Sequence, residues 1–305
     1  MKVATSKPVP LSRARAVGRT AKEETLDIMD SNAPATAVVQ DDVAPRRRNQ
    51  TRYLIGQFLW NMIPPMTFVA IVGLWAVSVK VFEVPSYLLP APDAVFRLLI
   101  AEAPMLWANT KVTLLEILLG FGLTILLAIP LGLVIALSPL AKQVLYPPAM
   151  LLQLVPKIAM APLFLVWFGF GIESKVILTL LMTFFPLLIA SISGFQILDT
   201  RLLYLTRSMG ANTWQTFRYL RVPAALPVIF SGIKTSATIA ATAAIVAEFV
   251  GANEGLGYVL LRGTSTMNME LTFAVLVILT VIGLAINYAV ELTEWALAPW
   301  QRKSK

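Results

Sequence analysis

Residues 207–227 read RSMGANTWQTFRYLRVPAALP and lie between two long apolar stretches of the chain. Residues 202–209, LLYLTRSM, which overlap the start of this stretch, favour a short helix with one apolar face. Gly210 stands where that helix would end, because glycine accepts the left-handed turn at this point. Asn212 or Thr213 can then cap a second helix. The stretch is more ordered than a plain connecting loop needs to be.

The second helix places three side chains on neighbouring turns, namely Trp214, Phe217 and either Leu220 or Arg221. Val222-Pro223 is expected to stop it, since the residue before a proline avoids the helical region. Two interpretations fit this predicted helix–turn–helix equally well. It is either a docking surface for a partner protein or an interfacial amphipathic segment that anchors in the membrane.

The composition indicates an integral membrane protein. The 305 residues are 57% hydrophobic and 14% charged, whereas soluble domains are about 25% charged. There are no cysteines and no histidines, so disulfides, thiol nucleophiles and Cys/His metal sites are excluded. The net charge of +8 is read as a topology signal and not as nucleic-acid binding.

Apolar runs near 20 residues, the length that crosses the hydrocarbon core, predict an all-α protein with six transmembrane helices. Prolines fall inside several of these runs, which favours a packed bundle of bent helices, because neighbouring helices must satisfy the freed carbonyls. The predicted spans are residues 58–82, 112–137, 148–170, 175–197, 225–250 and 272–297.

Lys and Arg near the span ends predict that both termini are cytoplasmic. Residues 1–54 are expected to be a disordered cytoplasmic tail, 55–298 the transmembrane domain, and 299–305 a short basic cytoplasmic end. The larger basic set is Arg46, Arg47, Arg48, Arg52, Lys142, Arg201, Arg207, Arg218, Arg221, Arg302, Lys303 and Lys305. The smaller, outer set is Lys80, Arg97, Lys111, Lys175 and Arg262.

The stretch around Gly210 resembles the cytoplasmic coupling loop of ATP-binding-cassette (ABC) importer permeases, whose pattern is Glu-Ala-Ala, three residues, Gly, nine residues, Ile-x-Leu-Pro. Gly210 and Leu220-Arg221-Val222-Pro223 keep the spacing, while Tyr204-Leu205-Thr206 replaces Glu-Ala-Ala. VPKIAMAPLFLVWFGFG at 155–171 and VAEFVGANEGLGYVL at 246–260 are similar to segments of the nitrate/sulfonate/taurine-type permeases. Together the three motifs and the six-span layout extend the resemblance over roughly residues 55–298.

The resemblance implies a type I importer permease bundle in the bacterial inner membrane, with a coupling loop at 199–224. It implies a cytoplasmic ATPase dimer, a periplasmic or lipid-anchored substrate-binding protein and a second permease copy or related subunit as partners. The chain itself has no G-x-x-x-x-G-K-[ST] motif, so it is not expected to be an enzyme or to hold a cofactor; ATP-Mg would lie on the ATPase. The implied ATPase-docking residues are Gly210, Ala211, Trp214, Phe217, Leu220 and Pro223.

Candidates for the translocation path are charged residues inside the spans, which are costly in lipid unless they face a cavity or each other. Lys157 either attracts an anionic substrate or only positions helices through a carboxylate or helix-end carbonyls. Glu248 is expected to bond to the segment EGLGY and shape a gate, and Glu116 could take part in an ion pair. Trp167 either lines the path or packs at the interface.

The resemblance to this subfamily implies a small anionic or heteroaromatic nutrient as substrate, with sulfonates, taurine, nitrate, thiamine-pyrimidine precursors and riboflavin all open. The rival hypothesis is an ion-coupled secondary transporter with Glu116 and Glu248 as coupling carboxylates. A membrane scaffold without transport is a further alternative, against which the prolines and intramembrane charges argue.

Overall fold

The structure, a computed structural model, describes residues 47–300, and every described regular element is helical. Of the described residues, those from 47 to 63 belong to one unit and those from Pro64 to a second, and the packing below concerns the second unit. The elements are α1 (Arg47–Val81), α2 (Pro92–Ala101), α3 (Ala103–Leu137), α4 (Pro139–Leu154), the 3-10 turn η2 (Lys157–Met160), α5 (Ala161–Phe168), α6 (Ile172–Gln196), α7 (Thr200–Ser208), α8 (Thr213–Thr216), the π-helical turn η3 (Phe217–Arg221), α9 (Val222–Gly251), α10 (Leu256–Ser265) and α11 (Met269–Leu297).

The prediction of six spans is confirmed for five of them within the described residues. Helices long and apolar enough to cross a membrane are Met62–Val81, Ala103–Leu137, Ile172–Gln196, Thr213–Gly251 and Met269–Leu297. The sixth exists only if α4 and the η2–α5 segment count as one span.

The predicted third span, 148–170, is wrong as a continuous helix. The chain bends by 83° between Pro139–Leu154 and Lys157–Phe168. Val155 takes an extended conformation before Pro156, as expected of a residue that precedes proline. The prolines predicted to bend helices thus break this one.

The boundary of the predicted N-terminal tail also needs correction. Helix α1 begins at Arg47, so residues 47–54, expected to be disordered, are helical. The rest of the predicted tail, residues 1–46, and the end of the chain, 301–305, lie outside the described residues.

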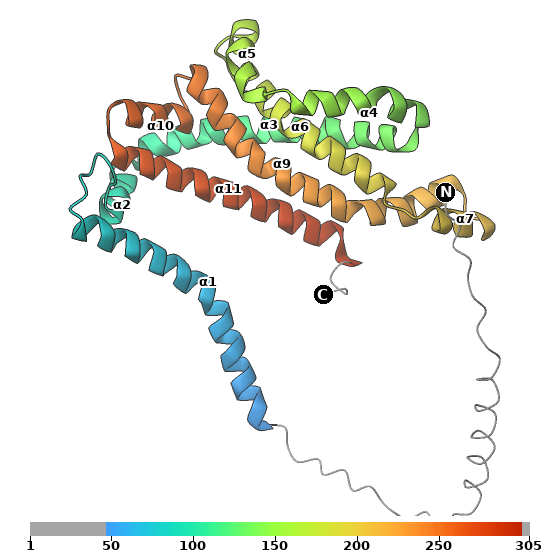
Figure 1. Cartoon of the computed structure of the whole chain (residues 1–305), viewed down its shortest axis with the longest axis horizontal. Helices are drawn as coiled ribbons and strands as arrows, with labels where there is room; N and C mark the ends of the chain where they lie inside the picture. Colours follow the sequence, from blue (N-terminus) through green and yellow to red (C-terminus); the bar gives the residue numbers. More distant parts are fainter. Residues whose placement is uncertain (1–46, 301–305) are drawn as a thin grey trace, which may run out of the picture. The chain divides into compact units, whose positions relative to one another are not determined.

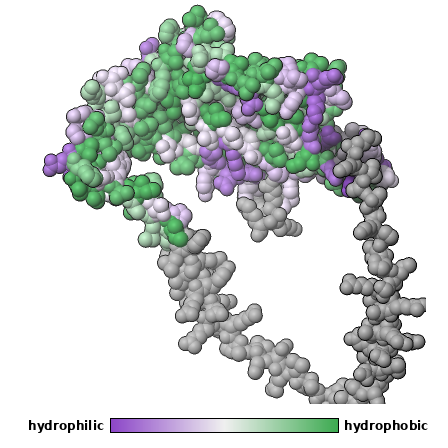
Figure 2. All heavy atoms as spheres, in the orientation of Figure 1, coloured by the Kyte–Doolittle hydropathy of each residue, from purple (hydrophilic) through white to green (hydrophobic). Residues whose placement is uncertain are grey.

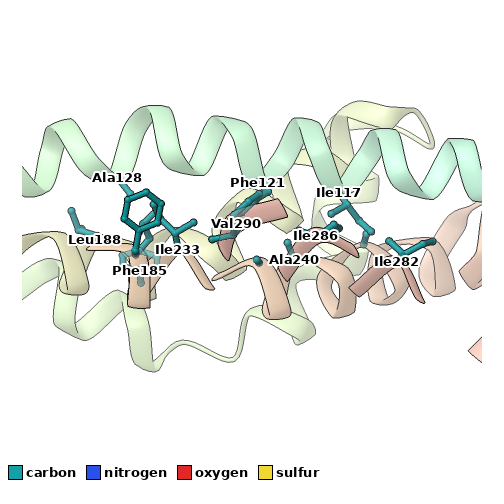
Figure 3. Close-up of a cluster of buried hydrophobic side chains, with 14 of the residues drawn as sticks. Ile117, Phe121, Ala128, Phe185, Leu188, Ile233, Ala240, Ile282, Ile286 and Val290 are labelled. Atoms are coloured by element: carbon teal, nitrogen blue, oxygen red, sulfur yellow. The ribbon is translucent and has the colours of Figure 1, made fainter. Parts of the chain in front are cut away.

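Helix α6 occupies the middle of the bundle and packs along both α3 and α9, while α11 lies beside α9 (Figure 1). Apolar side chains from these four helices meet in one core (Figure 3). Ile117 from α3 and Leu187 from α6 are fully buried in it. Outside this core, large apolar side chains such as Leu126 and Leu284 are exposed, and hydrophobic residues cover much of the face shown in Figure 2. In a bilayer such a surface meets lipid, which explains why exposure carries no penalty here.

Helices α3 and α6 approach closely because glycines on α3 leave room for side chains of α6. A Cβ added at Gly120 would lie 2.6 Å from Thr179 Cβ, and one at Gly132 would lie 2.5 Å from Ser191 Cβ. Small residues at such crossings let backbones come together in membrane proteins. This contact joins α3 and α6, the two helices that carry the buried ion pair described below.

We expect Gly120→Ala to destabilise the bundle by about 1–3 kcal/mol, the usual cost of overpacking a filled contact. Gly122→Ala is the matched control, because it is on the same helix and an added Cβ there meets nothing within 4 Å. Melting temperatures in detergent would measure both variants. Equal effects of the two substitutions would contradict the close-packing argument.

Candidate functional site

The segment 199–224 begins with a capped helix and a glycine turn. The carboxylate of Asp199 accepts a hydrogen bond from the Arg201 N–H at 2.9 Å and caps α7. Gly210 has φ +81°, the left-handed conformation predicted for it, and the Ala211 N–H closes the turn on the Thr206 carbonyl at 3.0 Å. An L-residue at this position would be strained by about 1–2 kcal/mol.

Asn212, one of the two predicted caps, starts the next helix with a complete capping box. Its side chain accepts from the Gln215 N–H at 2.8 Å, and the Gln215 side chain accepts from the Asn212 N–H at 2.9 Å. These two bonds satisfy otherwise unpaired N–H groups. Hydrogen bonds between residues close in sequence therefore order the exposed turn.

The prediction that Val222-Pro223 stops the second helix is wrong. The chain continues through η3 into α9, so that Thr213–Gly251 forms one helical segment long enough to cross a membrane. The Val222 N–H bonds to the Phe217 carbonyl, five residues back. A proline ring clashes with the preceding helical turn, and the wider π-turn gives that ring space. Such π-turns are frequent at functional sites.

Trp214 and Phe217 stack with ring centroids 5.7 Å apart and planes 27° apart. They line a hollow of about 700 Å³, together with Leu133, Leu137, Leu203, Arg207, Ala211, Thr213, Thr216 and Arg221. The structure thus brings Ala211, Trp214 and Phe217 together at one concave surface. Gly210 is exposed beside it, whereas Leu220 and Pro223 are half-buried and do not line the hollow.

A second polar site lies inside the bundle. Lys175 on α6 donates to Glu116 on α3, with Nζ and Oε1 2.6 Å apart, and both side chains are buried, at 7% and 1% exposure. The expected ion pair of Glu116 is therefore present. Its partner was not predicted, because Lys175 was assigned to the outer basic residues that report topology.

Glu248 on α9 binds the turn that leads into α10, as predicted. It accepts a hydrogen bond from the Gly257 N–H and another from the Thr113 hydroxyl at 2.6 Å. The Thr113 oxygen accepts from the Leu256 N–H at 2.8 Å, and the Asn109 side chain accepts from the Gly255 N–H, also at 2.8 Å. The start of α10 is thus fastened to α3 and α9 by side chains.

Sequence reasoning missed the contribution of Asn109 and Thr113. A signal was present, because Asn109, Thr113 and Glu116 recur at helical spacing on one face of a lipid-spanning helix. The glycines of EGLGY carry a signal too. A Cβ at Gly255 or Gly257 would lie within 3 Å of Glu248 side-chain atoms, so only glycine fits against that carboxylate.

Lys157 lies at the bend between α4 and α5. Its ammonium donates to the Gln153 carbonyl at 2.7 Å and sits 5.2 Å from the centroid of the Phe185 ring. Bonding to a carbonyl at the end of α4 is what the positioning interpretation expects. Trp167 is 60% exposed and packs edge-on against Phe164 at 5.9 Å. The structure brings neither residue to the Glu116–Glu248 cluster.

The fold and these two sites define a helical membrane protein with an ordered surface segment and a buried cluster of charged side chains. Residues 128–303 match the family described as binding-protein-dependent transport system inner membrane component, and the chain belongs to this family. It is 34% identical to the formylaminopyrimidine transport permease ThiX of Halalkalibacterium halodurans, over 79% of this chain and 96% of that protein. It is 33% identical to the riboflavin transport system permease RibX of Chloroflexus aurantiacus, over 85% and 96%.

Among solved structures, the inward-facing MetNI methionine ABC transporter matches with a TM-score of 0.54 at 20% identity, over 63% of this chain and 97% of that chain. This likeness supports the predicted importer-permease fold. The protein is therefore the transmembrane component of a binding-protein-dependent ABC importer in the inner membrane. Family membership decides against the ion-coupled secondary transporter and the scaffold.

Proposed function

We propose that the segment 199–224 docks the ATPase that powers this importer, through the hollow formed by Trp214 and Phe217. The observation that carries the proposal is the preorganised turn, with Gly210 at φ +81° and a capping box at Asn212. A surface already fixed by local bonds loses little conformational entropy on binding. The adjoining Arg207 and Arg221 add positive charge, so the receiving groove on the ATPase should be apolar with an acidic rim.

The importer works with an ATPase and a binding protein, as its family implies. We propose in addition that ATP-Mg is held by an ATPase dimer, that this chain holds no cofactor, and that a second permease copy or related subunit completes the path. In this arrangement both termini and the segment 199–224 face the cytoplasm of a bacterial cell. A periplasmic or lipid-anchored protein delivers substrate at the opposite face. The excess of Lys and Arg near one set of span ends supports this orientation.

The proposed substrate is a small heteroaromatic or anionic nutrient. Support comes from the relatives, whose names state transport of formylaminopyrimidine and of riboflavin, while others are named for transport of aliphatic sulfonates and of taurine. Uptake of labelled formylaminopyrimidine, riboflavin, taurine and an alkanesulfonate by cells with and without this gene would separate these classes. Unchanged uptake of all four would reject the proposed class.

The docking proposal is tested by co-purifying the tagged full-length permease with its ATPase. We expect Gly210→Ala to weaken ATPase recovery several-fold, because about 1–2 kcal/mol of backbone strain opens the turn. Gly283→Ala is the control. A Cβ added at either of these two glycines would meet nothing within 4 Å, but of the two it is Gly210 that has a positive φ. Equal ATPase recovery with both variants would contradict a role for this turn in docking.

A further inference from the structure

The cluster that joins α3, α6 and the end of α9 contains two carboxyl groups and one ammonium group. Glu116 and Glu248 are each 1% exposed, and Lys175 is 6% exposed. Of the other charged residues on these helices, Lys111 and Glu173 are exposed, and Lys234 on α9 is half-buried and pairs with Glu294 of α11. Two ionised carboxylates beside one ammonium would leave an uncompensated negative charge in the low-dielectric bundle, which is costly.

The hydrogen bonds of the cluster show where that charge is relieved. Both oxygens of Glu248 already receive donors, from the Thr113 hydroxyl and the Gly257 N–H. Glu116 Oε1 receives the Lys175 ammonium at 2.6 Å. Glu116 Oε2 is buried and has no hydrogen-bond partner among the described residues. The carboxyl group of Glu248 is its neighbour.

The side chains must be neighbours for a geometric reason as well. Thr113 and Glu116 are three residues apart on α3 and so share one face of that helix. Since Thr113 holds Glu248 by a 2.6 Å bond, the carboxyl of Glu248 lies against the same face as Glu116. Two carboxyl groups in contact are stable when one proton is shared between them.

We propose that this cluster is a proton-binding site, in which Glu116 Oε2 carries a proton and donates it to the carboxylate of Glu248. The assignment satisfies every oxygen of both side chains and brings the net charge of the cluster to zero. Glu248 then holds the start of α10 as a carboxylate with three donors. The proton fastens α3 to the end of α9, and its loss sets two like charges against each other there.

The test compares Glu116→Gln and Glu248→Gln in the full-length permease, purified with its ATPase in lipid. A glutamine at 116 imitates the neutral acid, because its oxygen can accept from Lys175 and its amide can donate to Glu248. We expect that variant to fold and to retain ATPase binding. A glutamine at 248 cannot accept on both sides from Thr113 and Gly257, so we expect a clear loss of stability. The reverse order of the two variants, or failure of Glu116→Gln to fold, would overturn the assignment.

Infrared spectroscopy supplies a readout that a merely structural role would not move. The wild-type spectrum should contain a protonated carboxylic-acid band that shifts in D₂O and is missing from Glu116→Gln. In addition, the ratio of folded to unfolded wild-type protein, compared with that of Glu116→Gln, should fall as the pH rises. The expected fall is about tenfold for each added pH unit between about pH 5 and the pH at which the proton leaves. The sign follows because the folded state keeps a proton that the unfolded chain releases. A spectrum without this band, and parallel pH profiles, would show that Glu116 is ionised.

Discussion

Replacing Lys175 by methionine should destabilise the permease by about 3–5 kcal/mol, the usual effect of removing one partner of a buried ion pair. Lys175 and Glu116 are bonded at 2.6 Å with almost no exposure, so removal of the ammonium leaves Glu116 Oε1 without its donor inside the bundle. Glu248 is part of the same cluster, which would be left with net negative charge. Since three helices meet there, the loss affects the whole bundle.

The measurement is the melting temperature of the purified protein in detergent, with a fall of about 10 °C expected. Lys111→Met is the matched control, because Lys111 is an exposed lysine on α3 whose nearest described aromatic partner is Trp107, at 5.6 Å. That substitution should change stability by less than about 1 kcal/mol. If both variants melted alike, the buried pair would contribute nothing specific to the fold.

Trp214→Ala should weaken binding of the ATPase by about 30-fold or more, corresponding to the cost of about 2 kcal/mol that defines a binding hot spot. Trp214 is 64% exposed in the isolated chain and stacks on Phe217 at the rim of the hollow. Aromatic residues in a preorganised concave surface are the usual anchors of protein interfaces. ATP-driven uptake should fall with the lost complex, while the melting temperature of the permease alone should stay unchanged.

Trp107→Ala provides the matched comparison for this variant. Trp107 is 60% exposed, close to the exposure of Trp214, and lies near the start of α3, whereas Leu133 and Leu137 near its end line the hollow. Its replacement should leave ATPase affinity within about twofold of the wild type. A titration in which both tryptophan variants bind the ATPase normally would remove Trp214 from the docking surface.

Much of the fold follows from local sequence. Apolar runs of membrane length predicted both ends of α6, α9 and α11 and the end of α3 to within a few residues, whereas α3 begins earlier than predicted. The prediction works because in lipid a helix must satisfy its own backbone. The turn at Gly210 and the cap at Asn212 were also predicted, since both depend on hydrogen bonds between residues close in sequence.

Other features depended on contacts that no local rule contains. Pro156 broke the predicted span 148–170, whereas Pro223, expected to end a helix, lies within one after a π-turn. Both prolines follow the same steric rule, and only the surrounding structure decides whether the chain bends or widens its helix.

By itself, the sequence determined the class of protein, five of its spans and the shape of the exposed turn, because each arises from hydrophobic length or local bonding. Tertiary structure alone decided that Lys175, assigned from the sequence to the outer basic residues, pairs with Glu116, 59 residues away. It alone placed Thr113 against Glu248, 135 residues away. A buried charge takes whatever partner the packing of helices brings to it, and that packing depends on side chains far apart in the chain.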